Sequence, residues 1–249
     1  MIEAASEVHL WSCMVDLSAA SLHEAYEALS DDELERARRY RFPRDECRFV
    51  AARYFLRRTL AEYLSVGPRE LSFTYGPFGK PMLPARLDGT RLEFNLSHSG
   101  EMVVLAIGRG PAVGVDVEQV IRVSELDAIA SRFFSASEKA ALNEVPAQAR
   151  DFAFYCCWTR KEAFLKALGD GLAHPLDSFD VSLDEKSPRL IAVRSDREAP
   201  AGWTLTHFCP APGYVGALAA NAKVVRVVWR SRGRSEEDLV GGPADLRTP

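Results

Sequence analysis

Long apolar runs are missing from this sequence of 249 residues. The most apolar stretches, "MVVLAIG" and "VGALAA", are as short as strands, whereas a bilayer-spanning helix needs about 20 apolar residues. The first residues, "MIEAASEVHLWSCMVDLS", lack a charged segment followed by an apolar core, so no secretory signal is expected. We therefore expect a cytoplasmic protein that has no membrane partner.

An excess of charge of one sign is also missing. The formal net charge is −4 and the sequence pI is about 5.8. This acidic balance argues against a general binder of polyanions, and no nucleic-acid partner is expected. The five cysteines are odd in number and lack the CxxC spacing of metal sites, which indicates reduced, mostly apolar filler residues.

Helices and short strands alternate along the chain. The apolar periodicity predicts a strand near 8–17, a helical stretch over 22–64, a hairpin around Ser99 and Gly100, and three later helices, the longest in "RDFAFYCCWTRKEAFLKALGDG". Ser30 and Glu33 fit a capping box, and Gly169 and Gly171 fit the end of the last helix. Residues 231–249 are charged and poor in apolar side chains, which predicts a disordered tail.

Two segments of the sequence resemble each other weakly. Both "EFNLSHSGEMVVLAIG" and "WTLTHFCPAPGYVGALAAN" read as a strand, Leu-Ser/Thr-His, a turn and a second strand of small apolar residues. Two related lobes that meet near residues 113–120 would explain the similarity, and so would chance resemblance between hairpins.

The stretch "GVDVEQV" carries two carboxylates on one side of a predicted strand. Its valines alternate with Gly114, Asp116 and Glu118, the period of a strand with one apolar face. Residues two apart on a strand lie roughly 6.5–7 Å apart, so these two anions repel unless a positive charge lies near them. Solvent or arginine partners would also relieve the repulsion.

A later helix offers a third carboxylate. In "WTRKEAFLKALGDG", Glu162 and Lys166 stand four residues apart and hence on one helix face. Taken alone, they form an ordinary surface pair, but with Asp116 and Glu118 they give a ligand set suited to Mg²⁺ and a phosphate substrate. Candidate phosphate contacts are Lys80, Ser97, His98, Arg48 and Arg53, each of which also has an ordinary structural explanation.

Five motifs together resemble the 4′-phosphopantetheinyl transferase superfamily: "FGKP", "FNLSHSG", "GVDVE", "RFFSASE" and "WTRKEAFLKALGDGL", in this order over residues 33–183. The length is similar to that of its longer, monomeric class, which serves nonribosomal peptide and polyketide synthesis. The resemblance implies an α+β fold of two pseudo-symmetric lobes, residues 1–118 and 119–230. Each lobe would be a small antiparallel sheet packed with helices, with the active site at the lobe interface.

The resemblance also implies roles for individual residues. Asp116, Glu118 and Glu162 match the metal ligands for Mg²⁺, with Mn²⁺ as an alternative. The remaining matches are Lys80, Ser97 and His98 for the phosphates of coenzyme A, Lys166 near the pyrophosphate, Arg36 and Arg48 near the 3′-phosphate, and Glu138 in a supporting catalytic role. Glu33 departs from the family pattern, because some members carry a basic residue there.

The implied reaction moves the 4′-phosphopantetheine arm of coenzyme A to a serine of an apo acyl or peptidyl carrier protein. Adenosine 3′,5′-bisphosphate leaves, and Glu162 is a candidate base for the serine proton. Two alternatives follow from the same residues. One is a Mg²⁺-dependent phosphohydrolase or nuclease, and the other is a non-catalytic protein that binds coenzyme A or a carrier.

Overall fold

The computed structural model describes residues 6–15, 18–84, 92–169 and 174–231. The first half runs from a strand through three helices to two small hairpins: β1 (Ser6–Met14), α1 (Ala19–Ala28), α2 (Asp31–Ala37), α3 (Pro43–Leu64), β2 (Thr74–Tyr75), β3 (Pro81–Met82), β4 (Leu92–Ser99) and β5 (Met102–Arg109). The second half runs similarly: β6 (Val113–Gln119), α4 (Leu126–Phe133), α5 (Ala136–Asn143), α6 (Arg150–Leu168), β7 (Phe179–Val181), β8 (Leu190–Val193), β9 (Thr204–Phe208), β10 (Tyr214–Ala220) and β11 (Val225–Ser231).

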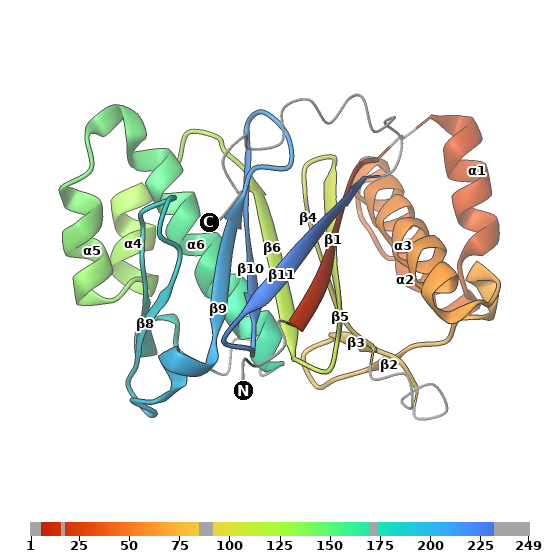
Figure 1. Cartoon of the computed structure of the whole chain (residues 1–249). Helices are drawn as coiled ribbons and strands as arrows, with labels where there is room; N and C mark the ends of the chain where they lie inside the picture. Colours follow the sequence, from red (N-terminus) through yellow and green to blue (C-terminus); the bar gives the residue numbers. More distant parts are fainter. Residues whose placement is uncertain (1–5, 16–17, 85–91, 170–173, 232–249) are drawn as a thin grey trace.

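Two sheets form the centre of the molecule, with helices on their outer sides (Figure 1). The first sheet has the order β11-β1-β5-β4 and the second has the order β6-β10-β9. In each half, the opening strand pairs antiparallel with the second strand of the later hairpin: β1 with β5, and β6 with β10. The predicted α+β fold of two pseudo-symmetric halves is confirmed. The sequence did not indicate that β11 would join β1 in parallel.

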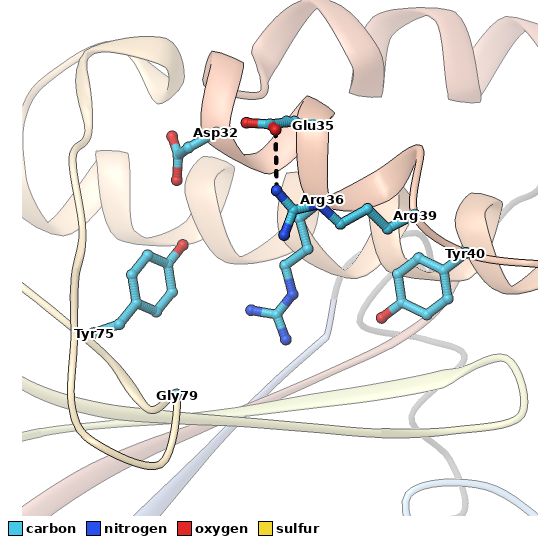
Figure 2. Close-up of a pocket in the computed structure, with 7 residues that line it drawn as sticks. All are labelled: Asp32, Glu35, Arg36, Arg39, Tyr40, Tyr75 and Gly79. Carbon is cyan, nitrogen blue, oxygen red and sulfur yellow. Dashed lines mark hydrogen bonds and ion pairs between the residues drawn. The ribbon is translucent and has the colours of Figure 1, made fainter.

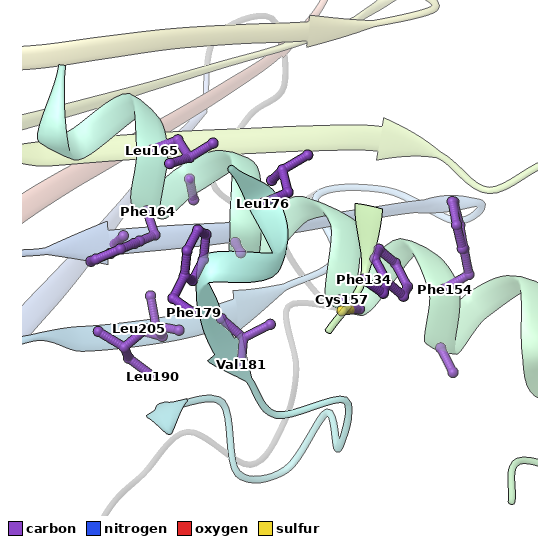
Figure 3. Packing of buried hydrophobic residues seen from close by; sticks show 14 of the residues in the cluster. Phe134, Phe154, Cys157, Phe164, Leu165, Leu176, Phe179, Val181, Leu190 and Leu205 are labelled. Atoms are coloured by element: carbon purple, nitrogen blue, oxygen red, sulfur yellow. The ribbon is translucent and has the colours of Figure 1, made fainter. Parts of the chain in front are cut away.

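Apolar cores hold these layers together. Alternate residues of the two sheets meet face to face, including Leu10, Val104, Val115 and Leu218. On the outer sides, α3 packs on the first sheet and α6 packs on the second. The core around α6 is rich in aromatic rings, among them Phe164 and Phe179, whose centroids lie 4.8 Å apart (Figure 3). Burial of these apolar faces is the main force that fixes both sheets.

The predicted helical stretch over 22–64 is wrong as a continuous element. The structure divides it into α1, α2 and α3. Ser30 and Glu33 form the predicted capping box and so start α2. Pro43 occupies the first turn of α3, where its missing N–H costs no hydrogen bond.

Two predicted turns at glycine lie within the described residues, and both are confirmed. Gly100 joins β4 to β5 with a φ of 59°, and Gly169 ends α6 with a φ of 81°. Both are left-handed conformations that glycine adopts without strain. Gly171 and the predicted tail beyond residue 231 lie outside the described residues.

The sheets do not follow a division of the chain at residue 118. β6 pairs in the second sheet, and β11, near the end of the described chain, pairs in the first. The units 1–118 and 119–230 therefore stay a prediction. Across the described residues, no helix is long and apolar enough to cross a membrane.

Candidate active site

The candidate site forms where β6 lies against α6. Gly114 permits this close approach, because a Cβ atom there would lie 2.1 Å from the Ala163 carbonyl oxygen and 2.3 Å from the Ala167 nitrogen. The valines of β6 face the core between the sheets, while Asp116 faces α6 and is 4% exposed. The predicted alternation is confirmed, and α6 also covers the polar side of this strand.

Asp116 lies at the centre of a short polar network. Its Oδ1 accepts a hydrogen bond from Ser97 Oγ at 2.8 Å and one from Lys166 Nζ at 2.6 Å. Lys166 Nζ also donates to Ser97 Oγ at 3.0 Å. The structure thus brings together three predicted site residues that come from β6, β4 and α6.

Glu118 and Glu162 share the electrostatic surroundings of Asp116. Burial and the negative charges of Asp116 and Glu162 raise the pKa of Glu118, while its hydrogen bond from Ser99 and the charge of Lys166 oppose this. Burial and the Asp116 charge likewise raise the pKa of Glu162, against the Lys166 charge. Three carboxylates so placed favour a cation among them.

The carboxylates fit a divalent cation by their chemistry, although no group of three metal-ligating side chains in the described chain has ready metal-holding geometry. Asp116 Oδ2 is buried and has no hydrogen-bond partner, which is costly for a carboxylate oxygen. Its other oxygen binds the Lys166 ammonium. Oxygen donors of this kind suit Mg²⁺ or Mn²⁺. The metal-ligand set Asp116, Glu118 and Glu162 stays a prediction.

His98 and Lys80 border this network in different ways. The surrounding protein and the charges of Lys166 and Arg48 lower the pKa of His98, although part of its side chain is exposed, so its imidazole is neutral near pH 7. Lys80 Nζ donates to the backbone carbonyl of Lys166 at 2.7 Å, near the end of α6. Lys80 therefore contacts the helix that carries Lys166, and its predicted phosphate contact stays a prediction.

Arg36 lies apart from the carboxylates, in a pocket of about 660 Å³ between α2 and the β2–β3 hairpin (Figure 2). The pocket is lined by Asp32, Glu35, Arg36, Arg39, Tyr40, Tyr75 and Gly79. The lining combines two arginines with two tyrosines, which suits a charged, planar ligand, although Arg39 also pairs with Glu35. Arg48 lies on α3, with its Nη1 3.5 Å from Asp45 Oδ1 and its Nε buried without a hydrogen-bond partner.

Glu138 is held inside the protein, and its predicted supporting catalytic role stays a prediction. Its side chain is 1% exposed, and Oε1 lies 2.7 Å from Lys161 Nζ. The same oxygen accepts from the Val181 N–H, and Oε2 accepts from the Ser135 N–H in a capping box. Both carboxylate oxygens have partners within the protein, so Glu138 fixes α5 against α6.

Glu33 lies in a position in the first half that matches the position of Glu138 in the second half. Its carboxylate forms buried ion pairs with Arg53 and Arg57, and its side chain is 1% exposed. This explains the acid where some family members carry a base: Glu33 faces the core and leaves no charge for a phosphate. The capping box is visible in the sequence, whereas the ion pairs are not, because no local pattern indicates that Arg57 is buried.

The network of an acid, a serine and a lysine that joins β6, β4 and α6 suits a phosphate-bearing substrate. Comparisons with known proteins agree. The family description "4'-phosphopantetheinyl transferase superfamily" matches residues 112–219, and "4'-phosphopantetheinyl transferase, N-terminal" matches residues 16–109.

Full-length relatives identify the family. The chain is 38% identical over 213 residues to 4′-phosphopantetheinyl transferase HetI of Nostoc sp., which covers 86% of this chain and 87% of HetI. It is 32% identical over 192 residues to 4′-phosphopantetheinyl transferase Sfp of Bacillus subtilis, which covers 77% of this chain and 82% of Sfp. The chain belongs to the 4′-phosphopantetheinyl transferase superfamily, in its two-domain class. It is a transferase that uses coenzyme A to activate carrier proteins.

Proposed function

We propose that this transferase moves the 4′-phosphopantetheine arm of coenzyme A to a serine of apo acyl or peptidyl carrier proteins of nonribosomal peptide, polyketide or fatty acid synthesis, and that it acts as a cytoplasmic monomer. One observation supports the site most directly. Asp116 keeps a buried, unpartnered Oδ2 beside Lys166, Glu118 and Glu162. A carboxylate oxygen in that position suits a cation and the phosphates that the cation binds.

The proposed metal ligands are Asp116, Glu118 and Glu162, and Mg²⁺ or Mn²⁺ bound there would neutralise charge on the pyrophosphate. Lys166 adds a fixed positive charge next to Asp116. His98, neutral near pH 7, can donate one hydrogen bond to a phosphate oxygen. Phosphoryl transfer depends mainly on such positioning and charge stabilisation.

Glu162 is the proposed base for the carrier serine. Burial and the nearby Asp116 charge raise the pKa of Glu162, which makes its carboxylate a stronger base. Lys166, one helical turn later on the same face of α6, keeps a positive charge beside it. The two side chains can thus accept the serine proton and oppose the charge of the leaving phosphate.

The pocket near Arg36 is the proposed seat of the nucleotide part of coenzyme A. Arg36 and Arg39 offer charge for its 3′-phosphate, and Tyr40 and Tyr75 offer aromatic surface for its base. The backbone of Gly79 lines the pocket, while the next residue, Lys80, reaches the end of α6. The hairpin thereby connects the pocket to the carboxylates.

Mass spectrometry of apo carrier domains tests this proposal. Domains from peptide, polyketide and fatty acid systems are incubated with the protein, coenzyme A and Mg²⁺. Matched reactions contain a chelator or the Asp116→Asn variant. We expect a mass gain of one phosphopantetheine arm on at least one carrier, and no gain in the matched reactions. Free phosphopantetheine without any carrier gain would indicate the phosphohydrolase alternative instead.

A further inference from the structure

One face of β4 carries three polar side chains that all reach β6. The two strands lie beside each other but belong to different sheets (Figure 1). Asn95 Oδ1 accepts a hydrogen bond from the Val115 N–H at 2.8 Å, and Ser97 Oγ donates to Asp116 at 2.8 Å. Ser99 Oγ donates to Glu118 Oε2 at 2.6 Å. Side chains of β4 thus make the hydrogen bonds to this edge of β6, in place of the backbone hydrogen bonds of a neighbouring strand.

The hydrogen bonds of Ser99 fix the direction of its proton. Ser99 Oγ accepts from the Gln119 N–H at 3.1 Å, so its own hydrogen is left for the Glu118 carboxylate. Two contacts from neighbouring residues of β6 therefore hold one hydroxyl. A glutamate side chain has several rotamers of similar energy, and a charge-assisted bond to one oxygen selects among them.

Ser97 and Ser99 act on the two acids in parallel. Each serine donates to one oxygen of its carboxylate, Asp116 Oδ1 or Glu118 Oε2. The second oxygen of Asp116 is then left buried and unpartnered. The family resemblance implies a phosphate contact for Ser97 and no role for Ser99.

We propose that Ser99 is a positioning residue, which holds Glu118 in the orientation that lets it bind the divalent cation together with Asp116. This rests on the proposed metal site. Partners of this kind, one shell beyond the ligands, set the orientation of ligating carboxylates, and their loss typically weakens metal affinity about 10–100-fold.

The experiment measures Mn²⁺ binding to the full chain in the presence of coenzyme A, by electron paramagnetic resonance of free Mn²⁺, without any carrier protein. We expect Ser99→Ala to bind Mn²⁺ roughly 10–100-fold more weakly than the unsubstituted protein. Ser99→Thr keeps the hydroxyl and should restore the affinity. Ser21→Ala, on exposed α1, is the matched control and should change nothing.

Three outcomes decide between the explanations. Unchanged Mn²⁺ affinity in Ser99→Ala, with or without a lower melting temperature, overturns the proposal and leaves Ser99 a structural role alone. Affinity as weak in Ser99→Thr as in Ser99→Ala overturns it too, because the hydroxyl would not be the cause. Absence of Mn²⁺ binding in the unsubstituted protein overturns the metal site itself, which separates that failure from a failure of the Ser99 proposal.

Discussion

The two halves of the molecule share a scaffold but differ in their chemistry. In each half a capping-box glutamate, Glu33 or Glu138, forms a buried ion pair with a cation of the long helix, Arg57 or Lys161. Each cation stands eight residues before the left-handed residue that ends its helix. Each also donates to two backbone carbonyls of the segment that follows the helix.

At the positions of the proposed metal ligands, the halves diverge. Asp116 and Glu118 lie opposite Ala217 and Val215 of β10, four and two residues after the turn glycine Gly213. The matching positions on β1, counted from Gly100, are Ser12 and Met14. On the helices, Arg58 and Glu62 stand where the second half has Glu162 and Lys166.

The difference between the halves indicates which residues stabilise the fold and which residues belong to the proposed reaction. The buried glutamate–cation pair occurs twice and so belongs to the scaffold, whereas the paired carboxylates of the strand occur in the second half only, among the described residues. Each of the following experiments changes one residue in the second half and, where the first half offers a counterpart, the matching residue there.

The largest expected effect is on turnover. Replacing Glu162 with Gln removes a proposed ligand and base, so we expect kcat for transfer to fall by roughly 10²–10³-fold while coenzyme A still binds. Arg58→Gln, at the matching position of α3, should leave kcat within a few-fold. Steady-state transfer assays and calorimetric titration with coenzyme A measure both quantities. Near-normal turnover by Glu162→Gln would remove this residue from the chemistry.

The second effect is on stability. Glu138→Gln and Glu33→Gln each leave a buried cation without its counter-charge, and we expect each to lower the free energy of unfolding by about 3–5 kcal/mol. Denaturant unfolding of the metal-free protein measures the change. Because both carboxylate oxygens of Glu138 are bound within the protein, kcat per folded molecule should stay within a few-fold. A loss of kcat as large as that of Glu162→Gln, in folded protein, would support the catalytic role of Glu138.

A third effect concerns pH. Burial and neighbouring carboxylates raise the pKa of Glu118 and Glu162 in the folded protein. The folded state therefore binds their protons more tightly than the unfolded state, and stability from these groups is lost as pH rises through the raised pKa values. We expect metal-free Glu162→Gln to melt at a higher temperature than the unsubstituted protein at pH 7, and the gap to close below pH 4.

Melting curves across this pH range check the sign of the effect. Arg58→Gln in the first half is the control, and its curve should stay parallel to that of the unsubstituted protein. A metal-free Glu162→Gln protein that is less stable at pH 7 would show that this carboxylate is not under electrostatic strain.

The smallest expected effect is on carrier docking. Exposed arginines gather in the first half near Tyr40 and Phe42, namely Arg36, Arg38, Arg39, Arg41 and Arg44. If carriers present acidic surfaces there, added salt should weaken carrier binding more steeply than coenzyme A binding. Arg41→Ala should reduce that salt slope, and Arg197→Ala, exposed in the second half, should not. Equal salt slopes for carrier and coenzyme A would contradict this placement.

Local patterns in the sequence predicted much of the fold. The valines of β6, the capping box at Ser30 and the glycine at the end of α6 each act over a few residues, so the sequence alone revealed them. The break between α2 and α3 was missed because apolar spacing continues across it. Pairing of β11 with β1 joins distant segments, and no local pattern reports it.

For the site, the sequence indicated which residues carry the polar groups, but it did not indicate which of them contact each other. It indicated that Asp116 needs a positive charge nearby, and the structure places Lys166 against it. The sequence did not indicate that Glu138 is buried, because resemblance of a motif does not report burial. The alternation of Asn95, Ser97 and Ser99 in "NLSHS" was a visible signal of a polar strand face, although its meaning depends on β6 lying alongside.

The pairing of β11 with β1 has a consequence for biosynthesis. Residues 225–231 add to the strand at 6–12 as its parallel neighbour, so one side of β1 stays open until nearly all of the described chain has left the ribosome. An open strand edge is a template for mispairing with other chains, and contacts between such distant segments form slowly. The nascent chain therefore depends on its last strand to close the first sheet.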